Sequence, residues 1–180
     1  MILFMNFSLS EVVSKTIICI VICIVLLYLV FAVFSIISAF SYRNKIKSCY
    51  KSFTIIIFEK IKIIQELHDF LIKKELINKK FEYDIQKNLL NKTYSECYMD
   101  LIKIYNDLLS SLRYNNTFKE IKSDKLFLRI LKFNNETDIQ YFKLLENYNY
   151  VTVAYNYYVK NKLTILWMKI FKLKPKENSF

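Results

Sequence analysis

The chain of 180 residues contains no glycine and a single proline, Pro175. Phosphate-binding loops and the nucleophile elbow of hydrolases both depend on glycine, so neither motif is present. Strand-rich folds rely on tight turns, in which glycine, asparagine and proline are favoured. Although asparagine is plentiful here, a β-fold without any glycine is improbable. We therefore expect an all-α protein.

Candidate metal ligands are also scarce. The only histidine, His68, lies near Glu66 and Asp69, whereas a metal site usually needs three or more convergent ligands. We expect His68 on a solvated helix surface, and we expect no metal, no cofactor and no catalytic residues. The cysteines show neither disulfide nor metal spacing; they are Cys19, Cys23, Cys49 and Cys97.

One long stretch lacks charge altogether. Residues 16–42 contain no charged side chain and lie between Lys15 and Arg43. A bilayer core of about 30 Å requires roughly 20 apolar residues in a helix. The apolar core of a signal peptide is shorter, about 7–15 residues, and ends at a small-x-small site that Ile37-Ser38-Ala39 does not provide. We predict a retained transmembrane helix over 16–42.

Basic residues near the ends of this run predict its orientation. Lys15 alone precedes the run, whereas Arg43, Lys45, Lys47 and Lys51 follow it. The positive-inside rule then places residues 1–15 outside the cell membrane and the body in the cytoplasm.

The chain carries a formal net charge of +11, which suggests attraction to the anionic headgroups of a lipid bilayer. Solvated helix faces in an AT-rich genome are the alternative explanation. Nucleic acid binding would require a concentrated basic face or a known module, and the lysines are instead spread through every segment. We expect no nucleic acid partner.

Apolar periodicity predicts three long helices, packed antiparallel, over residues 43–162. The first continues the membrane helix to about 74–78, the second runs from Glu82 to about Tyr114, and the third follows Ser123 as its cap. Lys60 interrupts the first apolar seam, where we expect tight packing to end. Asn134 and Thr137 are polar positions in the third seam that either set its register or mark a break.

The C-terminal segment, residues 163–180, is predicted to hold a short basic amphipathic helix. Trp167 and Phe171 share its apolar face, whereas Lys169 and Lys172 lie on the other. Such a helix either lies in the membrane interface or packs its apolar face against the bundle.

Several segments follow, in chain order, the pattern of one known group of proteins. Residues 43–50, Arg43-Asn44-Lys45-Ile46-Lys47-Ser48-Cys49-Tyr50, are similar to R-N-x-V-x-x-A-W. Later in the chain, Phe127-Leu128-Arg129-Ile130 corresponds to the middle of N-F-L-x-L-Q, and Thr137-Asp138 corresponds to a T-E pair. Tyr148-Asn149 and Tyr155-Asn156 correspond to Y-N-x-x-V-x-x-Y-N, with Thr152 for the valine, and residues 170–175 correspond to L-F-G-F-K-P. The chain thereby resembles the LemA family, a bacterial group of single-span helical proteins.

The resemblance covers nearly the whole chain and implies a membrane-anchored helical bundle without an established enzymatic activity. The chain departs from the pattern at Gln65, where members usually have proline, and at Lys172, where they have glycine. The F-P pair before the tail is missing as well.

The Tyr-Asn pairs allow two interpretations. Tyr148 and Tyr155 are two helical turns apart, so their rings share one face about 10 Å apart. With Asn149 and Asn156 beside them, they form either a ladder that hydrogen-bonds to a neighbouring helix or a partner chain, or a buried part of the bundle core.

We expect a non-enzymatic scaffold at the membrane that acts through a membrane protein partner or through self-association in a homo-oligomer. A regulator or adaptor of a membrane enzyme, and a membrane-active small protein, remain as alternatives. The sequence does not identify the partner.

Overall fold

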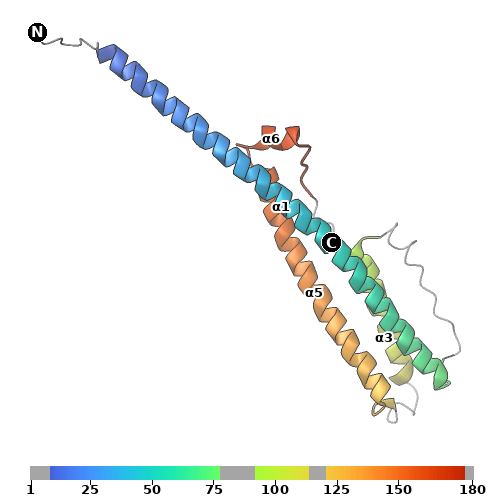
Figure 1. Ribbon diagram of the computed structural model, residues 1–180. Coiled ribbons are helices and arrows are strands. Elements are labelled where there is room, and N and C mark those ends of the chain that lie inside the picture. The colour runs from blue at the N-terminus through green and yellow to red at the C-terminus, as the bar shows by residue number, and fades with distance from the viewer. Residues whose placement is uncertain (1–8, 78–91, 114–120, 177–180) are drawn as a thin grey trace, which may run out of the picture. The chain divides into compact units, whose positions relative to one another are not determined.

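The computed structural model describes residues 9–77, 92–113 and 121–176. Its helices are α1 (Leu9–Lys73), α3 (Tyr94–Arg113), α5 (Lys125–Val159) and α6 (Ile165–Ile170), labelled in Figure 1. No strand occurs within these three ranges. The prediction of an all-α protein is confirmed.

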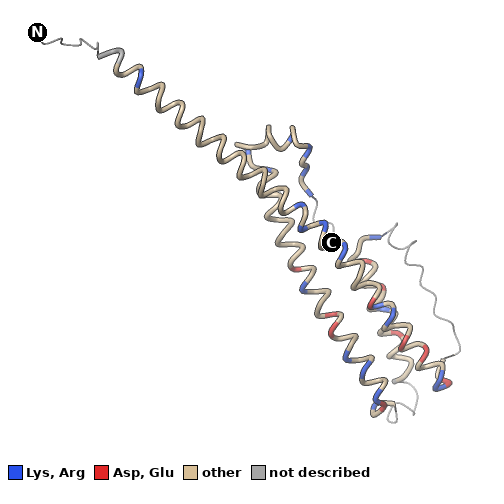
Figure 2. Tube along the Cα trace, in the orientation of Figure 1, with Lys and Arg blue, Asp and Glu red and all other residues tan. Residues whose placement is uncertain are grey.

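Helix α1 is continuous over 65 residues. Most apolar side chains between Lys15 and Arg43 are exposed, as for Leu27 (69%) and Val30 (68%). Figure 2 shows this stretch as an uncharged section of the trace. By length and composition, α1 is the one helix in the described part of the chain that could cross a membrane.

The chain divides into two compact units. The N-terminal unit comprises Met1–Arg43 and Val153–Lys176, and the central unit comprises Asn44–Thr152 and Glu177–Phe180. Helices α1 and α5 each contribute one part to both units.

Ring contacts within the central unit give the directions of its helices. Phe53 of α1 packs on Tyr141 of α5, and Phe70, further along α1, packs on Phe127, earlier in α5. These two helices are therefore antiparallel.

Helix α3 runs parallel to α1. Phe53 contacts Tyr94 at the start of α3, whereas Lys60, two turns later, contacts Tyr98 and Tyr105. The expectation that all three helices are antiparallel is therefore wrong for this pair. The connection between them includes residues 78–91, which lie outside the described ranges.

The apolar seam predicted for the first helix alternates in steps of three and four from Ile46, and its burial is confirmed at each position. A heptad spacing places every seventh residue on nearly the same face of a helix, so the whole seam can be buried together. Each seam position is at most 8% exposed: Ile46, Cys49, Phe53, Ile56, Lys60, Ile63, Leu67 and Phe70. Lys60 is completely buried, so tight packing continues through it, contrary to expectation.

Two helices end at left-handed residues, a conformation usually adopted by glycine. Glu75 has φ 58°, and the N–H of Leu76 donates to the carbonyl of Leu71 at 3.0 Å. Lys172 has φ 52°, and the N–H of Leu173 donates to the carbonyl of Met168 at 2.9 Å. The first end confirms the predicted end of α1 near residue 74.

The helix starts differ from expectation. Thr93 caps α3, because its hydroxyl accepts from the N–H of Glu96 at 3.2 Å while the Glu96 carboxylate accepts from the N–H of Thr93 at 2.7 Å. The prediction of one uninterrupted helix from Glu82 to about Tyr114 is therefore wrong, because a helix begins after Thr93. Residues 82–91 lie outside the described ranges. Asp124, not Ser123, holds the cap position of α5 and accepts from the N–H of Leu126 at 2.9 Å.

Candidate functional site

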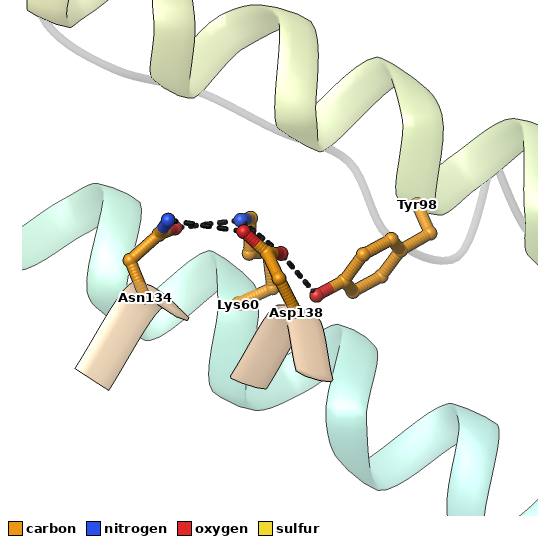
Figure 3. A network of polar contacts seen from close by, with 4 residues as sticks. All are labelled: Lys60, Tyr98, Asn134 and Asp138. Carbon is orange, nitrogen blue, oxygen red and sulfur yellow. Dashed lines mark hydrogen bonds and ion pairs between the residues drawn. The ribbon is translucent and has the colours of Figure 1, made fainter. Parts of the chain in front are cut away.

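A partly buried polar cluster joins the three helices of the central unit. Figure 3 shows Lys60 from α1 pointing toward Asn134 and Asp138 of α5, with Tyr98 reaching the same carboxylate from α3. Asn134 and Asp138 are four residues apart, which places them on one face of α5. We call these four residues the Lys60 network.

Short hydrogen bonds hold the Lys60 network together. The ammonium of Lys60 donates to Asn134 Oδ1 and to Asp138 Oδ1, both at 2.6 Å. The hydroxyl of Tyr98 donates to the same Oδ1 at 2.6 Å, and Asn134 Nδ2 donates to Asp138 Oδ2 at 3.0 Å. Both carboxylate oxygens of Asp138 are thus occupied.

The electrostatics follow from burial and from Asp138. Burial lowers the pKa of Lys60, and the adjacent Asp138 opposes that shift. Burial and the same carboxylate raise the pKa of Tyr98, and burial raises the pKa of Tyr105 to about 12. The Lys60 ammonium also lies 5.0 Å from the Tyr105 ring centroid and 5.5 Å from that of Tyr98, which favours the charged form.

We interpret the Lys60 network as a specificity element of the packing. A buried charge must be paired, and here the pairing is available only when α1, α3 and α5 lie in one register. The Lys60 side chain is fully buried and already engages Asn134 and Asp138. This arrangement fits a structural role better than proton transfer to a substrate.

Helix α5 continues through Asn134, so the predicted break there is wrong. The other interpretation, that Asn134 sets the register, stays a prediction. Sequence reasoning did not identify Lys60 or Tyr98 as partners of Asp138. The available signal was a lysine in one apolar seam and an aspartate beside the polar position of another.

The Tyr-Asn pairs have separate roles. The rings of Tyr148 and Tyr155 are buried, at 0% and 2% exposure, which confirms the core interpretation. The Tyr148 hydroxyl pairs with that of Tyr50 at 3.1 Å. Asn149 is exposed.

The second pair also fixes the C-terminal segment in the N-terminal unit. Tyr155 Oη donates to the carbonyl of Lys174 at 3.0 Å. Asn156 Nδ2 donates to the carbonyl of Lys176 at 2.7 Å, and Asn156 Oδ1 accepts from the N–H of Lys176 at 2.8 Å. Asn156 thereby forms a two-bond contact with the backbone, as another peptide group would.

The remaining motif residues do not converge on one site. Phe127 and Thr137 are buried in the central unit, and Phe127 stacks on Phe70 at 5.9 Å between ring centroids. Asn44 and Leu128 are exposed, and Arg43 is half-buried. The motif residues therefore divide between the core and the surface.

The predicted interface residues lie together in the N-terminal unit. Trp167 is half-buried, and Lys169 and Lys172 are exposed. Phe171 remains 46% exposed and packs edge-on against Phe40 of α1, with 6.1 Å between ring centroids.

His68 is buried at 5% exposure, so its predicted place on a solvated surface is wrong. It lies four residues after Ile64 and three before Leu71, and so extends the buried stripe of α1. No group of three or more His, Cys, Asp or Glu within the described residues could hold a metal ion.

The central unit also has a surface groove between α1 and α5, of about 340 Å³. Its lining mixes acidic and basic side chains, including Glu59, Lys62, Glu66, Arg129 and Glu136. It contains no arrangement that indicates a particular reaction.

Comparisons with family models, curated proteins and solved structures find no match to this chain.

Proposed function

We propose that this chain is a single-pass membrane scaffold of the LemA kind. In this proposal residues 16–42 of α1 cross the cell membrane, and the three helices of the central unit form a non-enzymatic interaction module in the cytoplasm. The observation that carries the proposal is the continuity of α1, which passes without a break from an exposed apolar run into a buried core. An anchor that leads directly into the body keeps that body close to the membrane.

One structural detail favours the LemA resemblance. Lys172 adopts a left-handed conformation at the position where the family pattern has glycine. Glycine is the residue that adopts this conformation at least cost. The residue differs from the pattern, but in this chain the position ends a helix in the conformation that glycine favours.

Membrane extraction tests the proposal. Leu26 and Val30 are 56% and 68% exposed, so replacing them leaves the core intact. Arginine near the centre of a span costs about 2.5–3.5 kcal/mol per residue on insertion scales. We expect the wild-type chain and a Leu26→Ile/Val30→Ile control to stay in the membrane after alkaline carbonate washing, and a Leu26→Arg/Val30→Arg variant to be released. Release of the wild-type chain would refute the anchor.

Crosslinking in the native membrane, followed by mass spectrometry, tests the interaction role. Recovery of this chain alone, in a fixed oligomer, would support a self-assembling scaffold. Stoichiometric recovery of one membrane enzyme would instead make the chain its adaptor or regulator. Recovery of monomer only, under conditions that crosslink a known membrane complex, would contradict the scaffold.

A further inference from the structure

The C-terminal part of the N-terminal unit folds back along the apolar run of α1. We call residues 158–173 the tail segment. Tyr158 packs against the rings of Phe34 and Tyr42, at 6.5 and 5.8 Å between centroids. Tyr28 Oη donates to the carbonyl of Leu163 at 2.7 Å.

The position of these contacts along α1 places the tail segment at membrane depth, if α1 spans the bilayer as proposed above. Tyr28 precedes Arg43 by 15 residues, or about 22 Å of helix. The interval from Lys15 to Arg43 is about 42 Å, which exceeds a hydrocarbon core of about 30 Å by about 12 Å. Even with the whole excess on the Arg43 side, Tyr28 lies about 10 Å inside the hydrocarbon boundary.

The small residues of α1 make this approach possible. Ala32, Ser35 and Ala39 are at most 2% exposed, in a run where most other side chains are exposed. They recur at spacings of three and four, so they lie on one face of the helix. Small side chains on one face allow a second segment to pack closely, as between helices within membranes.

The outer surface of the tail segment is apolar. Leu163, Leu166 and Ile170 are 62%, 63% and 59% exposed. Apolar side chains gathered on one side of a short helix favour burial, at roughly 25 cal/mol per Å² removed from water. Lys162, Lys169 and Lys172 are exposed around them, a combination typical of helices that bind anionic bilayers.

Three backbone groups of the turn before α6 are paired within the unit, and pairing of this kind is what a segment in lipid requires. The carbonyl of Leu163 is paired with Tyr28 Oη. The N–H of Leu163 donates to Asn161 Oδ1 at 2.9 Å, and the N–H of Thr164 donates to the carbonyl of Asn161 at 3.2 Å.

From these observations we infer that the tail segment is a second membrane element. It enters the leaflet on the Arg43 side of α1, inserts Leu163, Leu166 and Ile170 among the acyl chains, and binds anionic phospholipid headgroups through its lysines. The occupant of this apolar surface is thus the bilayer itself, because the surface adjoins the apolar run of α1 that the same bilayer would surround.

Trp167 is the only tryptophan of the chain, so fluorescence excited beyond the absorption of the tyrosines reports on the tail segment alone. The test reconstitutes the full-length protein into phosphatidylcholine vesicles with and without phosphatidylglycerol. A portion of the phosphatidylcholine carries bromine, a quencher, partway along its acyl chains. We expect Trp167 fluorescence to fall in brominated vesicles, and to fall further when phosphatidylglycerol is present.

Two matched variants give the control. Leu163→Ser/Leu166→Ser removes exposed apolar side chains of the tail segment and should abolish most of the quenching. Leu126→Ser/Leu128→Ser changes two leucines with 44% and 49% exposure in the central unit and should leave quenching unchanged.

Flotation of the washed vesicles separates the two hypotheses. Protein that floats with its vesicles while Trp167 is not quenched would overturn the tail insertion and leave the α1 anchor intact. Protein that does not float would overturn both. Loss of quenching at high concentration only, with dimers formed in parallel, would assign the surface to a second copy of the chain and would also overturn the proposal.

Discussion

At the scale of single residues, the charge of Lys60 is the least expected feature of the core. It stands at a seam position where apolar residues occur above and below, and its side chain is fully buried. Asp138 retains 25% exposure, so the two partners differ in how much solvent each can regain. This asymmetry predicts that substitutions of Lys60 and of Asp138 lower the free energy of unfolding by different amounts.

Asp138→Asn should destabilise the protein more than Lys60→Met does. Removing one partner of a buried pair typically costs about 3–5 kcal/mol, and Lys60 would be left without its counter-ion and without access to water. After Lys60→Met, Asp138 could still be hydrated. We expect the double variant to lose less free energy of unfolding than the two single variants together, because neither charge is then left without its partner. Urea unfolding in detergent, followed by circular dichroism, measures all four corners of the cycle, and strict additivity would contradict the coupling.

Glu75 offers a site where substitution should stabilise. A left-handed residue other than glycine costs roughly 1–2 kcal/mol, and the extra chain entropy of glycine offsets about 0.5–1 kcal/mol of that. Glu75→Gly should therefore raise the free energy of unfolding by about 0.5–1 kcal/mol. Lys73→Gly, in the last helical turn, is the matched control and should lower it. Equal effects from both changes would show that the left-handed conformation carries no cost here.

At the scale of the elements, apolar periodicity predicted the core faces of the helices well. Residues at three-four spacing must share a face, so the seam of α1 could be read before its partners were known. The break at Thr93 was missed because apolar positions continue on both sides of it. The capping sequence Thr93-Tyr94-Ser95-Glu96 was the signal for that break.

Neither the directions of the helices nor the Lys60 network could be predicted from the sequence. Periodicity identifies a buried face but does not say whether the neighbouring helix runs parallel or antiparallel. The pairing of Lys60 with Asp138 depends on that direction, since the partners come from α1 and α5, 78 residues apart. His68 shows the same limit, because a polar residue beside a seam can be read as either surface or core.

Thr93→Ala should shift the start of α3 without disturbing its core. The substitution removes the hydroxyl that accepts from the Glu96 N–H, and loss of a threonine cap costs about 1 kcal/mol. Thr93→Ser retains the hydroxyl and should restore most of the stability. Urea unfolding in detergent distinguishes them, and equal losses in both variants would argue against the cap.

At the scale of the whole molecule, buried tyrosines dominate the response to alkali. Within the described ranges, five tyrosines have a raised pKa: Tyr50, Tyr98, Tyr105, Tyr141 and Tyr155. The ordinary pKa of a tyrosine hydroxyl is 10.0. Above that pH the unfolded chain releases phenol protons that the folded chain keeps.

Stability should consequently fall as the pH rises above about 10. The lowered pKa of Lys60 makes stability rise with pH, but Lys60 is a single group and the five tyrosines act in the other direction. Urea unfolding at successive alkaline pH values, with tyrosinate absorbance recorded in parallel, would check this. A stability that is constant or rises over that interval would contradict the prediction.

The central claim, that α1 crosses the membrane once with the body inside the cell, is tested most directly by cysteine accessibility. Two chains without native cysteines would carry Ser8→Cys or Ser179→Cys, on opposite sides of the apolar run. An impermeant maleimide should label the first in intact cells and the second only after permeabilisation. Labelling of the Ser179→Cys chain in intact cells would contradict the account.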